Sequence, residues 1–342
     1  MVNVVYIIGA GASANALPII NTYKDSNGTL HASLIEELLA FTSRIKTSNG
    51  YEIYFKLCEE SEFFTTPDTF AKFLYVNGRN SDYLRLKVLI SAYFFWRERV
   101  RTDYEKCFDK RIISFLTTIS EINGSFPRNI KIISWNYDAQ FIKAFQLSKT
   151  QGESRFLTNY KSHPFAIDET VDKINLSLIH LNGIAGYTFD EKSNIISNKF
   201  SRPHFVFDDK TLLFENEFNE QEKIKKIIDM FSFPNESILI SYAWEQKRES
   251  NLDYPYANDR IQYAKALARG ADVLVVIGYS FPFFNREVDK LIFKEMPTLK
   301  KIYFQDPFLN GNFLHSQFEL DRRRVIIEHI SDVKNYYVPY EL

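Results

Sequence analysis

The chain has 342 residues, a formal net charge of -1 at pH 7 and two cysteines, Cys58 and Cys107. This charge gives no electrostatic reason to expect nucleic acid as a partner. Two distant cysteines exclude a disulfide framework and a four-thiolate zinc site, and no apolar run is long enough to cross a membrane. We therefore expect a cytoplasmic protein with one main domain that carries a sizeable insertion.

The first predicted element is a strand over residues 3–8 that runs into Gly9-Ala10-Gly11-Ala12-Ser13-Ala14. A β-branched strand followed by Gly-x-Gly-x-x-Ala is typical of dinucleotide-binding α/β domains. Gly9 would permit the tight exit from the strand, and Gly11 would let a pyrophosphate approach the backbone. Free N–H groups at the start of the next helix would face this anion. An ordinary strand-to-helix turn would carry the same glycines, so both interpretations stay open.

The next hundred residues predict helices in place of a second strand. Apolar residues recur with helical spacing near 35–42, 82–101 and 112–119. The second helix would bury one face, made of Leu84, Val88, Leu89, Ala92, Phe95 and Trp96. We interpret residues 27–128 as a helical insertion, which Pro127 brings to an end.

The second half of the chain predicts more strands, the clearest being the nearly continuous apolar run at 272–277. Helices are expected at 215–230 and 260–269, and residues 184–233 form a second, irregular insertion. The other strands are expected at 129–135, 174–181, 300–304 and 325–330. This pattern predicts an α/β protein with an open Rossmann-like parallel sheet and helices on both faces.

Polar residues follow several of these strands. They are Ser134 to Asp138, His180 to Gly183, and Gly278 to Pro282. Ligands of open parallel sheets sit beyond the carboxyl ends of the strands. If these strands are neighbours, their ends share one crevice with the glycine turn.

These segments carry a family resemblance. The glycine turn, Asn136-x-Asp138, His180 with a nearby glycine, and Gly278-Tyr279-Ser280 occur in the order seen in sirtuins. The chain resembles more closely the bacterial sirtuin-like NAD hydrolases of antiphage defence. It has no cysteine beyond Cys107, whereas protein-deacetylating sirtuins carry four zinc-binding cysteines after the histidine segment. The resemblance therefore implies NAD as substrate and no metal, with deacylation as a minor alternative.

The resemblance implies catalytic roles for three residues. Asn136 would hydrogen-bond the nicotinamide ribose or position a water, and Asp138 would contact the carboxamide side of nicotinamide. His180 would be the general base, a role that suits a near-neutral pKa. Structural alternatives are a helix cap for Asn136, a first-turn position for Asp138 and a structural strand-end histidine for His180.

The resemblance also implies residues that hold the rest of the dinucleotide. Gly9, Ala10, Gly11 and Ser13 would cradle the phosphates. Ser280, with the Gly278 backbone, would meet the phosphates or the adenosine ribose, and Asp306 would accept from ribose hydroxyls. Asp306-Pro307 is equally a turn signal. The remaining histidines show no metal-ligand spacing.

We expect an NAD glycohydrolase that depletes cellular NAD as a defence effector. Because no second domain is recognisable, activation would come from a homo-oligomer or from a partner such as a ring-forming ATPase, with no membrane and no direct nucleic-acid contact. One alternative is a regulatory subunit that binds NAD or ADP-ribose without cleaving it. An oxidoreductase ranks last, because residues 25–28 replace the acid-ended strand expected about 20 residues after the turn.

Overall fold

The computed structural model describes residues 2–19, 22–24, 30–100, 108–121, 126–147, 160–162, 176–190, 195–198, 218–232, 236–247 and 257–342. The chain divides into two compact units. Unit 1 comprises Met1–Ser13, Asp109–Gly183 and Ser241–Leu342. Unit 2 comprises Ala14–Phe108 and Ile184–Ile240.

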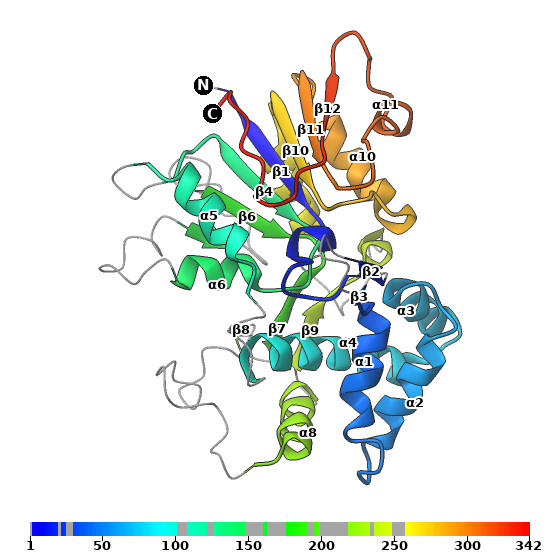
Figure 1. The fold of residues 1–342 in the computed structure, drawn as a ribbon. Coiled ribbons are helices and arrows are strands. Elements are labelled where there is room, and N and C mark those ends of the chain that lie inside the picture. Colours follow the sequence, from blue (N-terminus) through cyan, green and yellow to red (C-terminus); the bar gives the residue numbers. More distant parts are fainter. Residues whose placement is uncertain are drawn as a thin grey trace. The chain divides into compact units, whose positions relative to one another are not determined.

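Unit 1 is built on a seven-stranded sheet with the order β12-β11-β10-β1-β4-β6-β5, in which every paired strand is parallel (Figure 1). The strands are β1 (Val4–Ile8), β4 (Ile130–Ser134), β5 (Tyr160–Ser162), β6 (Leu176–His180), β10 (Val273–Ile277), β11 (Lys301–Gln305) and β12 (Ile326–Ile330). This confirms the predicted open Rossmann-like sheet.

The strand order reverses at β1. From β1 the chain builds β4 and β6 on one side, and it later returns to add β10, β11 and β12 on the other side. Ile8 pairs with Ile277 of β10 and with Ser134 of β4, and Ser134 pairs with His180 of β6. The carboxyl ends of these four strands are therefore level. A ligand site is expected at such a reversal of strand order.

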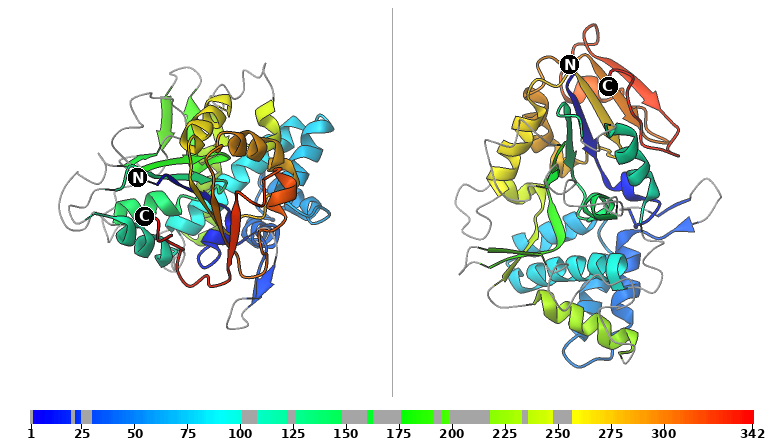
Figure 2. Two further views of the ribbon diagram at one scale, coloured as in Figure 1. Left: turned by 90° about the horizontal axis from the view of Figure 1, so that it is seen from above. Right: turned by 90° about the vertical axis from the view of Figure 1, so that its left-hand side faces the viewer.

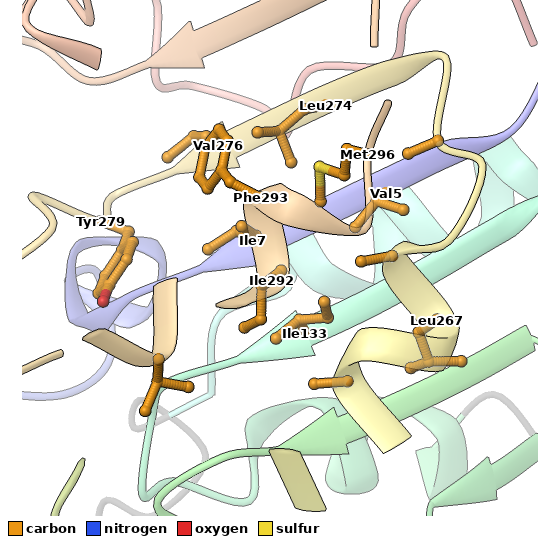
Figure 3. Packing of buried hydrophobic residues seen from close by; sticks show 14 of the residues in the cluster. Val5, Ile7, Ile133, Leu267, Leu274, Val276, Tyr279, Ile292, Phe293 and Met296 are labelled. Atoms are coloured by element: carbon orange, nitrogen blue, oxygen red, sulfur yellow. The ribbon is translucent and has the colours of Figure 1, made fainter. Parts of the chain in front are cut away.

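Helices cover both faces of this sheet, as the right-hand view of Figure 2 shows. Side chains alternate between the faces along each strand. Val5 and Ile7 of β1 face α9 (Ala257–Ala268) and α10 (Arg286–Lys294), and they join a core with Leu274, Val276 and Ile292 (Figure 3).

On the opposite face the ring of Tyr6 lies 5.0 Å from that of Phe115 in α5 (Lys110–Ile119). α6 (Gln140–Leu147) packs beside α5. Residues 110–119 fall within the range of the expected helical insertion, and they lie in unit 1. The described part of this unit also contains four short helices, namely η1 (Ala10–Ser13), η7 (Ala243–Lys247), η8 (Phe283–Asn285) and α11 (Leu314–Gln317).

Unit 2 is mainly helical. The helices in its described residues are α1 (Leu34–Ser43), α2 (Glu52–Ser61), α3 (Pro67–Val76), α4 (Asn80–Phe95), η2 (Trp96–Val100) and α8 (Glu220–Phe231). Local signals explain several of the helix starts. Ser33 forms a capping box with Glu36 at α1, and Asn219 forms one with Glu222 at α8. The side chain of Thr66 caps α3, whose first residue is Pro67.

Two details of unit 2 differ from the sequence-based prediction. The regular α-helix predicted to Arg101 ends at Phe95 and continues as the π-helical segment η2 to Val100, and Arg101 lies outside the described residues. The prediction that Leu84 lies on the buried face of this helix is wrong, because its side chain is 55% exposed. Most of the rest of α4 is buried on every side, including Lys87, so spacing alone does not identify its inner face.

Unit 2 also contains strands that the sequence did not reveal. β8 (Ile195–Asn198), β7 (Gly183–Asp190) and β9 (Glu236–Ile240) form a three-stranded sheet in that order. β2 (Tyr23–Lys24) and β3 (Leu30–His31) form a short antiparallel pair. The segment expected to be irregular thus includes regular strands. In the described parts of the chain, no helix has both the length and the apolar character that crossing a membrane requires.

Candidate functional site

The glycine turn interlocks with the end of β10. The Gly9 amide donates to the carbonyl of Ile277, and the Gly11 amide donates to the carbonyl of Gly278, both at 3.0 Å. A Cβ atom on Gly11 would lie 2.9 Å from Gly278 Cα, and one on Gly278 would lie 2.3 Å from the Ala12 nitrogen. The space beside Gly11 is therefore filled by Gly278, which corrects the sequence-based reason for this glycine.

After the turn the chain forms the four-residue 3-10 helix η1 in place of a longer helix. The Ala12 amide donates to the Gly9 carbonyl, so this N–H group is already bonded. Ala10 is half-buried, and Ser13 is buried. The carbonyl of Ala12 accepts from Arg111 Nη2 at 2.6 Å and from the Tyr336 hydroxyl at 3.0 Å. Side chains distant in sequence thus hold the far end of η1.

Ser13, Asn136 and His180 come together at the carboxyl ends of β1, β4 and β6. Asn136 Nδ2 donates to Ser13 Oγ at 3.3 Å, and the Asn136 carbonyl lies 3.3 Å from His180 Nδ1. Because a carbonyl only accepts, Nδ1 carries the ring proton and Nε2 carries the lone pair. Within the described residues, neither His180 Nε2 nor Asn136 Oδ1 has a hydrogen-bond partner.

The electrostatics of His180 differ from the sequence-based expectation. Burial, aided by the positive charge of Arg260 in α9, lowers the pKa of His180 to about 4, although the hydrogen bond to Asn136 opposes the shift. The expectation of a near-neutral pKa was wrong, because the ring is 1% exposed and the charged imidazolium loses its hydration. His180 is therefore neutral at pH 7.

Two further residues belong to this cluster and were not assigned from the sequence. Asn182 Nδ2 donates to the Trp135 carbonyl at 3.0 Å, and the Ser241 amide donates to the Asn182 carbonyl at 2.9 Å. Asn182 Oδ1 and Ser241 Oγ are buried without a hydrogen-bond partner in the described structure. Asn182 stands in the His180–Gly183 segment and could have been noticed, whereas nothing in the sequence marks Ser241.

The unpartnered atoms define what the site can bind. Asn136 Oδ1, Asn182 Oδ1 and His180 Nε2 are acceptors, and the Ser241 hydroxyl can donate or accept. Buried polar groups in native proteins nearly always have partners. A ligand that reached these acceptors would have to supply donors, such as sugar hydroxyls or a carboxamide NH₂.

Asp138 occupies a structural position beside this cluster. Its Oδ1 accepts from the Gln140 amide at 3.1 Å, where α6 begins. Asp138 therefore precedes α6 and caps it from outside, instead of lying in its first turn as the sequence-based alternative had it. A carboxylate that accepts an otherwise unpaired amide stabilises a helix start.

Ser280 and Asp306 lie beyond β10 and β11. Ser280 is exposed, and Asp306 is half-buried. Asp306 Oδ1 accepts from the amides of Phe308 and Leu309 at 2.8 Å each, which is the turn that Asp306-Pro307 predicts. Neither side chain is hydrogen-bonded to Asn136 or His180 in the described part of the chain.

A buried carboxyl joins two of the strand ends. Trp135 Nε1 donates to Asp289 Oδ1 at 3.1 Å, and the Tyr279 hydroxyl donates to Oδ2 at 2.9 Å. Asn285 Nδ2 donates to the same hydroxyl at 3.0 Å. Burial raises the pKa of Asp289 well above its ordinary value. Asp289 of α10 thereby connects the ends of β4 and β10, the two strands that flank β1.

Comparison with known proteins finds no matching protein-family model and no matching curated protein. The fold and the site define an α/β protein with a buried, acceptor-rich cluster at the carboxyl ends of parallel strands. Any function must therefore be argued from this cluster.

Proposed function

We propose that this protein is a sirtuin-like NAD glycohydrolase that cleaves NAD to nicotinamide and ADP-ribose. The observation that carries the proposal is that two acceptors of contacting residues, His180 Nε2 and Asn136 Oδ1, are both buried without a hydrogen-bond partner in the described residues. His180 is the last residue of β6 and Asn136 follows β4, and these two strands are adjacent and parallel. Ser13 of the dinucleotide-type glycine turn contacts the same Asn136.

The reaction needs little covalent chemistry from the protein. Water attacks C1′ of the nicotinamide ribose while the C1′–N bond breaks, and nicotinamide leaves with the bonding electrons as a neutral ring. The protein must hold the ribose and direct the water. His180 Nε2 would accept the proton from the water or from a ribose hydroxyl, and Asn136 Oδ1 would orient that donor. Asp138 would support the Asn136 segment from the start of α6.

The rest of the dinucleotide would extend along the neighbouring strand ends. Gly9, Ala10, Gly11 and Ser13 would border the phosphates, which would meet the turn from a side other than the one that Gly278 fills. Ser280 and Asp306 would reach the adenosine half. The exposure of Ser280 makes it free to contact a ligand from solvent.

In the cell the protein would deplete NAD as an antiphage effector, activated by self-assembly or by a partner such as a ring-forming ATPase. The test measures NAD and nicotinamide in infected cells that express the chain, and nicotinamide released by the purified protein with its co-purified partners. We expect release by the wild type and by His315→Gln, a control histidine in α11. Asn136→Ala and His180→Gln should abolish it.

Full activity of either Asn136→Ala or His180→Gln would overturn the residue roles. Unchanged NAD in infected cells, together with no nicotinamide from the purified complex, would overturn the proposed function.

One observation favours a second candidate, a subunit that binds NAD or ADP-ribose without cleaving it. A histidine whose pKa is about 4 is a weak general base at pH 7. Calorimetric binding of both ligands by the partner complex, with no nicotinamide release, would support this candidate over hydrolysis.

A further inference from the structure

We propose that Arg111 and Tyr336 are positioning residues of the His180 site, and that the C-terminal segment therefore helps to hold this site in place. Only the activity readout of this inference rests on the proposed function. Tyr336 stands 324 positions from Ala12 in the sequence, yet its hydroxyl hydrogen-bonds the Ala12 carbonyl.

A continuous series of contacts runs from these residues to His180. Arg111 Nη2 and the Tyr336 hydroxyl donate to the Ala12 carbonyl at 2.6 and 3.0 Å, so two donors hold this oxygen. The next residue, Ser13, accepts from Asn136 Nδ2 at 3.3 Å. The Asn136 carbonyl accepts from His180 Nδ1 at 3.3 Å, which sets the ring orientation and its tautomer.

The contacts of Arg111 close a ring around the Asn136–Asp138 segment. Arg111 Nε donates to Asp109 Oδ1 at 2.9 Å, and the Asp109 amide donates to Gln140 Oε1 at 2.9 Å. The Gln140 amide donates to Asp138 Oδ1 at 3.1 Å. All these side chains are less than one-tenth exposed. The ring ties the glycine turn to the segment that carries Asn136.

The C-terminal segment, residues 331–342, is itself fastened to the sheet. Gln305 Nε2 in β11 donates to the carbonyls of Asp332 and Asn335 at 2.6 and 2.7 Å. Gln305 Oε1 accepts from the Tyr337 amide at 3.0 Å. Arg111 Nη1 donates to the Val333 carbonyl at 2.8 Å. The backbone is thus hydrogen-bonded at Asn335 and Tyr337, on either side of Tyr336. These bonds fix the position from which the Tyr336 hydroxyl contacts Ala12.

A buried hydrogen bond that fixes a reacting group acts on turnover more than on substrate binding. Loss of the Tyr336 hydroxyl would leave the Ala12 carbonyl with Arg111 alone. Ser13 would then hold Asn136 less firmly, and the His180 ring would sample a second orientation. The effect should appear at His180 itself, which a residue with a purely structural role would not influence.

The test compares Tyr336→Phe with Tyr303→Phe. The control loses a buried tyrosine hydroxyl that bonds the same C-terminal segment, through Glu341 at 3.0 Å, and not the glycine turn. Histidine ring ¹⁵N signals are recorded on the full-length protein and assigned with His180→Gln. We expect altered His180 signals and a kcat lowered about fivefold with KM unchanged in Tyr336→Phe, and wild-type values in Tyr303→Phe.

Arg111→Lys is the second variant, because lysine keeps the charge but cannot bond Asp109, Val333 and Ala12 together. It should perturb the His180 signals at least as much as Tyr336→Phe. Unchanged His180 signals in either folded variant would overturn the inference, whatever happens to kcat. If the wild type hydrolyses no NAD, the proposed function fails, and the ring signals still decide the positioning roles.

Discussion

The indole of Trp135 lies nearly parallel to the ring of Tyr279, with centroids 5.9 Å apart and an interplanar angle of 14°. Both side chains also donate hydrogen bonds to the carboxyl of Asp289. Trp135 directly precedes Asn136, and Tyr279 directly follows Gly278. One buried carboxyl therefore holds the two strand ends on either side of the glycine turn.

Asp289 should make stability depend on pH. Its folded pKa is raised above the ordinary 3.8, so its contribution to stability is complete below that pH and is lost as pH rises through the folded pKa. Asp289→Asn keeps the shape without the titration, and should therefore remove this decline. Denaturant unfolding from pH 4 to 8 measures it, with the exposed Glu287→Gln on the same helix as control. An identical pH slope in Asp289→Asn and wild type would contradict the prediction.

His180 should have the opposite dependence. Its folded pKa of about 4 lies below the ordinary 6.5, so its contribution is complete above pH 6.5 and is lost as pH falls toward 4. The loss amounts to about 3 kcal/mol, since each pKa unit corresponds to about 1.4 kcal/mol. His180→Gln should flatten the unfolding free energy between pH 6.5 and 4. An equally steep acid loss in this variant would show that another group is responsible.

Gly278 should tolerate no side chain. Its φ is +58°, and a Cβ would lie 2.3 Å from the backbone nitrogen of Ala12. We expect Gly278→Ala to cost about 3 kcal/mol or more, from strain and overpacking together. Gly270→Ala is the matched control, because Gly270 has a φ of +71° with nothing within 4 Å of its Cβ position. It should cost about 1 kcal/mol. Equal losses of stability for the two variants in thermal unfolding would show that the close packing of Gly278 against the glycine turn contributes nothing to stability.

The Ser241 hydroxyl should lower the stability of the unliganded protein and strengthen the binding of a ligand. Its hydroxyl is buried without a partner in the described residues, so Ser241→Ala should stabilise the unliganded protein by about 1 kcal/mol. The same change should weaken ADP-ribose binding, measured by calorimetry, because a ligand group loses its partner. Ser61→Ala is the control, since Ser61 Oγ donates to the Cys58 carbonyl at 2.7 Å and its loss should destabilise. Destabilisation by Ser241→Ala with unchanged binding would remove Ser241 from the site.

The sequence alone was enough to predict the parallel sheet and the segments that lie at its carboxyl edge. Strands such as 272–277 are short, apolar and β-branched, so their signal is local. The grouping of Ser13, Asn136 and His180 could likewise be anticipated, because parallel strand ends meet at one edge. Among the strands of unit 2, β9 carries the apolar run Ile238-Leu239-Ile240 and could have been noticed, whereas β2 and β3 have only two residues each.

The tertiary structure decided what the individual groups do. The space beside Gly11 is filled by Gly278, and burial lowers the pKa of His180. Neither effect could be predicted, because packing and desolvation depend on residues that no local pattern reveals. Ser241, Asp289, Arg111 and Tyr336 enter the site only through contacts across the fold. The sequence by itself determined where the strands end and which polar segments follow them, since strand ends follow from local periodicity. The strand order, which makes those ends neighbours at one site, is a property of the tertiary structure. Burial and long-range hydrogen bonds decided its chemistry.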